Sequence, residues 1–256
     1  MTNPVVITRP IAQAESLARS VAALGREVVV FPLLEIHPLP DPAALRAALN
    51  DLSRYAMVAF VSPNAIHAVF EHILCWPTEV ALAVVGEGSR ITLAQYGLDA
   101  SNSTIFYPRD PARTDSQTLL DALDLDALRG RRVLIVRGES GRELLADALR
   151  GAGVQVTQVA AYRRAAPDLD AVRSSQLQAL LDSPNDWIVT SSEALGILLK
   201  MVANIAGNAG VAKMQQKHLI VPHARIAEIA SKLHFQHITL TGSGDERLLA
   251  ALQSPT

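Results

Sequence analysis

Cysteine is nearly absent from this chain of 256 residues, in which Cys75 is the single example. One cysteine cannot form an internal disulfide, and this usage is compatible with a reducing compartment such as the cytoplasm. Aromatic residues are also scarce, at 4% of the sequence, although apolar residues as a whole reach 49%. Ala, Leu and Val supply most of that apolar bulk, which favours helices packed on a parallel sheet over an all-β sandwich.

Long runs of like charge are missing as well, and the formal net charge is −2. Broad electrostatic binding to nucleic acid or to an anionic membrane is therefore not indicated. Residues 1–4 contain no basic region, and no apolar stretch after them has the length of a signal peptide core or a membrane span. We therefore expect a cytoplasmic protein that binds neither nucleic acid nor membranes.

The sequence lacks the motifs of several enzyme classes. No two histidines stand at i, i+4 spacing beside a glutamate, and neither a P-loop nor a Gly-x-Ser-x-Gly elbow occurs. Gly86-Glu87-Gly88 could begin a dinucleotide loop, but Ile91 stands where the third glycine is needed. Cys75 falls in a predicted helix, where a small core hydrophobe is a better interpretation than a nucleophile. We expect neither a metal nor a cofactor.

Short apolar runs alternate with amphipathic helical patterns along the whole chain. Two such patterns, Glu15–Leu24 and Arg142–Arg150, are followed by Gly25 and Gly153 near helix C-cap positions. Short strands that alternate with helices predict an α/β fold with parallel sheets and right-handed crossovers. The predicted strands are Val5–Thr8, Glu27–Phe31, Met57–Val61, Ala81–Val85, Thr104–Tyr107, Arg132–Val136, Val154–Ala161, Trp187–Thr190, His218–Val221 and His237–Thr241.

The sequence contains an internal repeat. Residues 5–9 (Val-Val-Ile-Thr-Arg) are similar to residues 133–137 (Val-Leu-Ile-Val-Arg), so that Arg9 and Arg137 correspond at an offset of 128. The same offset pairs residues 60–62 with residues 188–190. A repeat this long indicates duplication of a domain, because solenoid repeats run over roughly 20–50 residues. We therefore expect two related α/β units of about five strands each.

Two extended apolar segments, residues 27–38 and 154–167, occupy equivalent places in the two repeats, and both end in proline. They could be core strands that overrun their sheets. They could also be paired straps that join two domains, which would make one domain discontinuous in sequence. Hydrophobic periodicity does not choose between these alternatives.

Candidate binding residues follow the predicted strands, because ligands of parallel α/β sheets bind outside the carboxyl ends of the strands. The residues found there are mainly hydroxyls, glycines and arginines, which can bind anions through free backbone N–H groups and bidentate contacts. For any single turn, the alternative is a Ser, Thr or Asn that simply caps a helix. His223 is a candidate general acid or an ordinary surface histidine. The candidate substrate-binding residues are Arg9, Ser62, Asn64, Gly86, Ser89, Arg137, Gly138, Arg142, Thr190, Ser191, Ser192 and Arg225.

A series of short motifs across nearly the whole chain resembles the uroporphyrinogen-III synthase family. The order and spacing of these motifs are more specific than any one of them. They are Val6-Ile7-Thr8-Arg9-Pro10, Pro32-Leu33-Leu34-Glu35-Ile36, Phe60-Val61-Ser62-Pro63-Asn64-Ala65, Val85-Gly86 with Ser89, Leu134-Ile135-Val136-Arg137-Gly138 through Gly141-Arg142, Val159 to Tyr162-Arg163-Arg164, Thr190-Ser191-Ser192 and Arg225-Ile226-Ala227.

The resemblance implies two flavodoxin-like parallel-sheet domains of related topology joined by a two-stranded β-ladder. Residues 1–36 and 168–256 would form a discontinuous domain and residues 37–167 the other, with the straps near 27–38 and 154–167. The active site would lie in the cleft between the domains. The family often has threonine where Ser89 stands, and Ser or Thr in the turn that here reads His223-Ala224-Arg225.

The resemblance also implies a cofactor-free lyase of porphyrin and heme biosynthesis. Its substrate would be hydroxymethylbilane, a linear tetrapyrrole with eight carboxylates, which is cyclised with inversion of ring D and loss of water. Tyr162 matches a family tyrosine that helps the hydroxyl group leave, and the equal alternative is a tyrosine that packs on a strap. A transient contact with the preceding enzyme of the pathway is compatible with this assignment.

Two rival functions fit the same predicted architecture. One is a cytosolic two-domain protein that binds a small anion without catalysis. The other is a nucleotide-dependent oxidoreductase, which the incomplete Gly86-Glu87-Gly88 motif disfavours.

Overall fold

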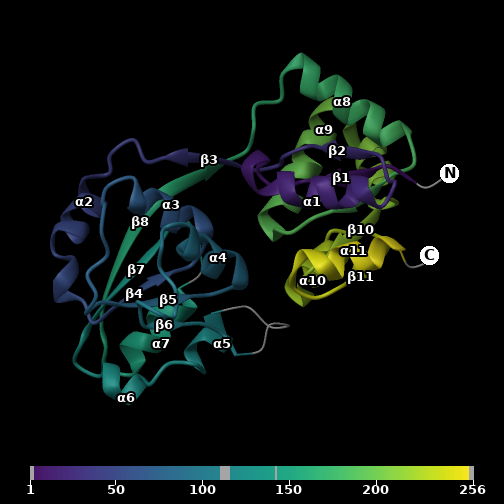
Figure 1. Cartoon of the computed structure of the whole chain (residues 1–256). Coiled ribbons are helices and arrows are strands. Elements are labelled where there is room, and N and C mark those ends of the chain that lie inside the picture. The colour runs from purple at the N-terminus through teal and green to yellow at the C-terminus, as the bar shows by residue number, and fades with distance from the viewer. Residues whose placement is uncertain (1–2, 110–115, 142, 254–256) are drawn as a thin grey trace. The chain divides into compact units, whose positions relative to one another are not determined.

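The computed structural model describes residues 3–109, 116–141 and 143–253, and the chain divides into two compact units. Unit 1 consists of residues 1–35 and 165–256, and unit 2 of residues 36–164. Each unit has one sheet with helices against both of its faces (Figure 1). The predicted α/β fold class is confirmed.

The sheet of unit 1 has the order β11-β10-β9-β1-β2, and all of its neighbouring strands are parallel. One face packs against α1 and α11, and the other against α8, α9 and α10. The strands are β1 (Val5–Ile7), β2 (Val28–Val30), β9 (Asp186–Ile188), β10 (His218–Val221) and β11 (His237–Leu240). The helices are α1 (Ile11–Ala23), α8 (Ala171–Asp182), α9 (Ser192–Gln215), α10 (Ala224–Lys232) and α11 (Asp245–Gln253).

The sheet of unit 2 has the order β3-β8-β7-β4-β5-β6. One face packs against α2, α3 and α4, and the other against α5, α6 and α7. The strands are β3 (Glu35–Pro38), β4 (Met57–Phe60), β5 (Ala81–Val84), β6 (Ile105–Phe106), β7 (Arg132–Gly138) and β8 (Gln155–Ala165). The helices are α2 (Ala43–Asn50), α3 (Pro63–Phe70), α4 (Glu87–Gln95), α5 (Ser116–Leu120), α6 (Leu125–Leu128) and α7 (Leu144–Gly151), with a 3-10 turn at Leu52–Arg54.

The two sheets share one strand order once the duplication is taken into account. When β1, β2, β9, β10 and β11 are numbered 1 to 5, unit 1 has the order 2-1-3-4-5 of flavodoxin-like folds. Unit 2 has the same order when β7, β8, β4, β5 and β6 are numbered 1 to 5, with β3 added beside β8. β1 therefore corresponds to β7 and β9 to β4, which agrees with the sequence offset of 128 residues. Each repeat supplies its first two strands to one unit and its last three to the other.

The extended segment 27–38 is not one strand. β2 ends at Val30 in the sheet of unit 1, and β3 begins at Glu35 beside β8 in the sheet of unit 2. Pro32 stands between them and has no backbone N–H to donate to a ladder. The N–H groups of Phe31 and Leu33 still donate to the carbonyls of Ile7 and Thr8, at 2.9 and 3.1 Å, so the chain leaves the sheet gradually.

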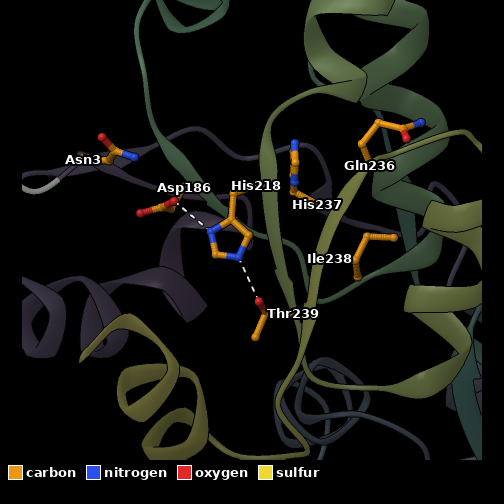
Figure 2. Close-up of a pocket in the computed structure, with 7 residues that line it drawn as sticks. All are labelled: Asn3, Asp186, His218, Gln236, His237, Ile238 and Thr239. Atoms are coloured by element: carbon orange, nitrogen blue, oxygen red, sulfur yellow. Dashed lines mark hydrogen bonds and ion pairs between the residues drawn. The ribbon is translucent and has the colours of Figure 1, made fainter. Parts of the chain in front are cut away.

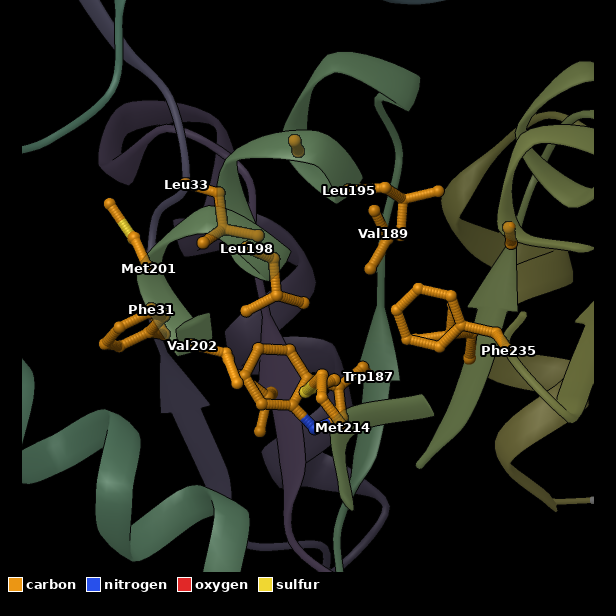
Figure 3. Close-up of a cluster of buried hydrophobic side chains, with 14 of the residues drawn as sticks. Phe31, Leu33, Trp187, Val189, Leu195, Leu198, Met201, Val202, Met214 and Phe235 are labelled. Carbon is orange, nitrogen blue, oxygen red and sulfur yellow. The ribbon is translucent and has the colours of Figure 1, made fainter. Parts of the chain in front are cut away.

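The core of unit 1 is built around Trp187, which is fully buried between α9 and the sheet (Figure 3). Its indole N–H donates to the side-chain oxygen of Asn185 at 2.6 Å, and its ring meets the edge of Phe31 at a centroid distance of 6.3 Å. Satisfying the indole N–H inside the core avoids the cost of burying an unpaired donor.

Helix α9 is long and apolar enough, by length and composition alone, to cross a membrane. Gly207 interrupts it with a φ of 58° and a ψ of −158°, so neither part reaches the about 20 residues that a membrane span requires. Its apolar side chains Leu195, Leu198 and Val202 are fully buried in the core of unit 1. We therefore interpret α9 as a core helix.

Candidate functional site

The predicted site residues that the structure describes lie at the carboxyl ends of parallel strands or in the turns that follow them. In unit 1 the chain moves from β1 to β2 on one side and returns to β9 on the other. In unit 2 the corresponding neighbours are β7 and β4. These pairs are the points where the strand order reverses, and flavodoxin-like sheets bind their ligands beside such points.

Ser62, Gly138 and Tyr162 are brought together at this edge of unit 2. The hydroxyls of Ser62 and Tyr162 are 3.0 Å apart and share a hydrogen bond. Ser62 is also the N-cap of α3, and its Oγ accepts the N–H of Ala65 at 3.3 Å. Tyr162 is 5% exposed, and its ring lies against Gly138, where an added Cβ would stand 3.0 Å from the ring. A side chain at position 138 would therefore push the tyrosine ring away by a few tenths of an ångström.

A β-bulge directs the tyrosine toward Ser62. β8 pairs with β7 so that Ala160 stands opposite Arg137 and Tyr162 opposite Gly138, which places Ala161 as an extra residue between them. Successive residues of a regular strand point to opposite faces, but the extra residue turns both Ala161 and Tyr162 toward the face that α3 covers. Bulges occur frequently beside active sites, where they redirect one side chain.

The remaining candidates of this edge lie at the start of α3 and α4. Gly86 is the N-cap of α4, and Ser89, in the first turn, is 4% exposed. Asn64 is the second residue of α3 and is half-buried. The two helix starts are neighbours, because a Cβ on Gly88 would be in ordinary contact, at 3.8 Å, with the ring of Pro63. Arg142 lies outside the described residues.

Arg137 lies on the other face of the same sheet. Its Nη1 donates to Glu143 at 2.5 Å and to Gln158 at 2.9 Å, and Gln158 in turn donates to Glu143 at 2.6 Å. Gly141 covers the guanidinium so closely that an added Cβ would be 2.5 Å from Nη2. Hydrogen bonds from Gln158 and Arg137 lower the pKa of Glu143, because they favour its ionised form.

In unit 1, Arg9 occupies the position that corresponds to Arg137. Its Nη1 is 2.8 Å from a carboxylate oxygen of Asp245, the first residue of α11. Thr190, Ser191 and Ser192 follow β9, and all three are half-buried. Ser191 is the N-cap of α9, but its hydroxyl makes no capping hydrogen bond.

His223 and Arg225 are the most exposed candidates of unit 1. His223 is the N-cap of α10, and its Nδ1 is 3.4 Å from the hydroxyl of Ser243 in the turn after β11. Arg225 is exposed on the first turn of α10. Strand β10 therefore places a histidine rather than a serine or threonine at the carboxyl edge.

A polar network at the opposite, amino edge of unit 1 was not predicted from the sequence. It lines a pocket of about 470 Å³, in which Asp186 meets Nδ1 of His218 at 2.9 Å and Nε2 of His218 meets Thr239 at 2.8 Å (Figure 2). Arg26 Nη2 donates to Asp186 at 2.5 Å and also to the carbonyl of Asn3. The sequence signal was a polar residue just before one predicted strand, Asp186 before Trp187–Thr190, and another at the start of the next, His218 in His218–Val221.

The chain of acid, histidine and hydroxyl has the order found in nucleophilic triads. Two observations make a structural role the better interpretation. Arg26 already binds the second oxygen of Asp186, so this carboxylate belongs to an ion pair and is shared between two partners. The three strands also present Asp186, His218 and Thr239 on one face, beside α11, whose Leu252 carbonyl accepts from Arg26 at 3.3 Å. We interpret the network as a staple of the amino edge.

Among the described residues, no group of three or more His, Cys, Asp or Glu side chains could hold a metal ion. The candidate groups of the carboxyl edges are therefore hydroxyls, backbone N–H groups, arginines, the amide of Asn64, the imidazole of His223 and the buried phenol of Tyr162.

Comparison with known proteins identifies a family. Residues 15–242 match the family described as uroporphyrinogen-III synthase HemD. The uroporphyrinogen-III synthase of Escherichia coli (strain K12) is 30% identical over 259 residues, which cover 97% of this chain and 99% of that protein. The enzyme of the same name from Salmonella typhimurium (strain LT2) is 28% identical, with the same coverage of both chains.

Solved structures show the same fold. The crystal structure of uroporphyrinogen-III synthetase from Helicobacter pylori 26695 matches with a TM-score of 0.62 and 15% identity, over 98% of this chain and 99% of that one. A mutant uroporphyrinogen III synthase from the extremely thermophilic bacterium Thermus thermophilus matches with a TM-score of 0.57 and 14% identity, over 97% of both chains.

Proposed function

This chain belongs to the uroporphyrinogen-III synthase family, and we propose that it is a lyase that converts hydroxymethylbilane to uroporphyrinogen III. The substrate loses its hydroxymethyl oxygen as water, and the distal pyrrole then attacks through its substituted carbon. The resulting spiro intermediate opens and closes again with that ring inverted. Because the substrate cyclises unaided to the other isomer, the protein must mainly position it.

The observation that carries the proposal is the pair of hydroxyls formed by Ser62 and Tyr162, 3.0 Å apart at the point where the strand order reverses. The departing hydroxyl needs a proton, and Tyr162 is the candidate donor. Ser62 accepts the N–H of Ala65, so its oxygen is fixed at the start of α3 and holds the phenol in one orientation. Tyr162 supplies the proton as water leaves and recovers one when the closed ring loses its own.

The substrate carboxylates require donors, and both carboxyl edges offer them. We assign carboxylate binding to the hydroxyls, the arginines and the N–H groups at helix starts. The proposed substrate-binding residues are Arg9, Ser62, Asn64, Gly86, Ser89, Arg137, Gly138, Arg142, Thr190, Ser191, Ser192 and Arg225, and Tyr162 is the proposed catalytic residue.

Exposed apolar side chains at the same edges support a substrate with flat rings. Ile11 follows β1 and is 74% exposed, and Leu240 ends β11 and is 51% exposed. In unit 2, Tyr107 follows β6 and Leu144 begins α7, and both are more than a third exposed. Apolar surface beside anion-binding turns is complementary to pyrroles that carry acetate and propionate arms.

The decisive experiment gives hydroxymethylbilane to protein freed of metals and cofactors and identifies the isomer produced. We expect uroporphyrinogen III at a rate above the spontaneous cyclisation. Formation of the other isomer alone, at the spontaneous rate, would contradict the proposal. Tight binding of the substrate without turnover would instead support an anion-binding protein.

A further inference from the structure

Ion pairs of the described residues fall into three groups by the exposure of their partners. In pairs such as Arg150–Asp147 (47% and 68%) both side chains are exposed. In Arg26–Asp186 (9% and 12%) both are buried. Two described pairs between an arginine and a carboxylate combine a largely buried arginine with an exposed acid. They are Arg137–Glu143, at 10% and 51%, and Arg9–Asp245, at 18% and 38%.

These two arginines are the corresponding residues of the duplication, each at the carboxyl end of a corresponding strand. Their acids do not correspond, because Glu143 caps α7 whereas Asp245 begins α11. The residue that corresponds to Glu143 is Glu15, which is exposed on α1. Two unrelated positions thus supply a carboxylate to the same place in the fold, which indicates that the arginine there is built to hold one.

We propose that Glu143 and Asp245 are internal stand-ins for substrate carboxylates, which displace them from Arg137 and Arg9. The proposal rests on the proposed function, because it assumes a polycarboxylate substrate. In unit 2 the geometry favours exchange at one atom. Gly141 covers Nη2 of Arg137, whereas Nη1 is the nitrogen that holds the exposed carboxylate of Glu143.

Exchange of one carboxylate for another leaves the number of charge-assisted hydrogen bonds unchanged, so the step is close to neutral in free energy. A ligand gains only through the contacts that the rest of its molecule makes. Small anions make no such contacts and cannot compete with a tethered carboxylate, whereas a molecule with many carboxylates can. The internal acids would therefore act as specificity-determining residues that keep phosphate, acetate and similar anions off the arginines.

The test uses Glu143→Gln, which keeps the size of the side chain and removes the charge, with Asp147→Asn on the same helix as the matched control. Asp147 pairs with the exposed Arg150, and its substitution removes the same charge from α7. We expect the KM for hydroxymethylbilane to fall by roughly 3- to 10-fold in Glu143→Gln, the effect of removing a modest competing ion pair. We also expect inhibition by millimolar acetate or phosphate, which the wild type and the control resist.

A rise in KM for Glu143→Gln would overturn the proposal, because it would mean that Glu143 holds Arg137 in its binding position. An unchanged KM together with unchanged resistance to acetate would overturn it as well. Asp245→Asn, with Glu246→Gln as its control, repeats the test in unit 1 on the ion pair of Arg9. If the wild type does not turn over hydroxymethylbilane, the proposed function fails by itself. Binding of uroporphyrin III, an octacarboxylate, by the same variants then still reports whether the carboxylates exchange.

Discussion

Unit 1 and unit 2 share a strand order but differ in the polar contacts at their sheet edges. Unit 1 has a side-chain network at its amino edge, where Asp186 joins Arg26 and His218. Unit 2 has a pair of hydroxyls at its carboxyl edge, where Tyr162 meets Ser62. The residue that corresponds to Tyr162 by the repeat offset is Leu34, a buried core residue of unit 1.

This difference follows from how each unit is assembled. Unit 2 is one continuous stretch of chain, whereas unit 1 must join residues 1–35 to residues 165–256. The staple connects Arg26 of the first stretch directly to Asp186 and Leu252 of the second, and Asp186 in turn bonds to His218. The duplicated scaffold is thus specialised, with the staple in unit 1 and the proposed proton donor in unit 2.

The largest effect is expected from a substitution that removes the chemical difference between the units. Unit 1 has Leu34 where unit 2 has Tyr162, so Tyr162→Phe leaves neither unit with a phenol at this position. We expect kcat to fall by roughly 10- to 10⁴-fold. The loss should appear in kcat more than in KM, because the hydrogen bond strengthens as the hydroxyl leaves. Steady-state kinetics with analysis of the isomer measures both, and isomer III should still predominate.

Tyr96→Phe is the matched control for this prediction, because Tyr96 also loses one hydrogen bond, to His67 at 2.9 Å, at the far end of α4. Its kcat should equal that of the wild type. An equal kcat for Tyr162→Phe would make Tyr162 a packing residue of β8.

The next effect concerns the free energy of unfolding, which should change in unit 1 and not in unit 2. Asp186→Ala leaves Arg26 buried without its carboxylate, and we expect unit 1 to lose about 2–4 kcal/mol of its free energy of unfolding. Hydrogen exchange in denaturant should show faster opening of β9 and β10 while β4 and β5 keep their protection. Asp182→Asn removes an exposed acid paired with Lys213 and serves as the control, because the loss of an exposed ion pair should change the protection of β9 and β10 little. Equal loss of protection in both units would contradict this assignment.

The same carboxylate makes the stability of unit 1 depend on pH. Burial acts to raise the pKa of Asp186, but hydrogen bonds and charge from His218 and Arg26 outweigh it and lower the pKa below its ordinary value. A lowered pKa in the folded state gives stability that is complete above the unfolded value of about 3.9 and is lost as pH falls through the folded value. Hydrogen exchange should therefore show that acid speeds the opening of β9 and β10 in the wild type, and that Asp186→Ala lacks most of this acceleration.

The smallest effect compares two helix caps. Ser62 accepts the N–H of Ala65 at the start of α3, whereas Ser191 makes no capping hydrogen bond at the start of α9. Ser62→Ala should cost about 1 kcal/mol in urea unfolding, and Ser191→Ala only a few tenths. Equal costs would show that the capping bond of Ser62 contributes nothing. Ser62→Ala should also lower kcat, because Tyr162 loses the group that orients it.

The sequence predicted the alternation of strands and helices because the inner strands, such as β1, β4 and β10, are short and largely buried apolar runs. β10 was predicted with the bounds that the structure has, His218–Val221. The repeat offset identified Arg9 and Arg137 as equivalent. It could not identify their partners, because Asp245 reaches Arg9 across more than 200 residues of chain. The bulge at Ala161 could not be predicted from the sequence either, because strand register depends on the neighbouring strand rather than on hydrophobic periodicity.

The discontinuous unit 1 has a consequence for how the chain is made. Residues 36–164 can complete unit 2 as soon as they leave the ribosome, but β1 and β2 must wait for β9 to be synthesised before the central pair of their sheet can form. During that interval the apolar residues Val5, Val6 and Ile7, which are fully buried in the finished protein, have no sheet to join. Contacts over such separations form late, and exposed strands of this kind aggregate. Nascent chains stopped after residue 164 should therefore depend on chaperones through their first 35 residues, while unit 2 is already folded.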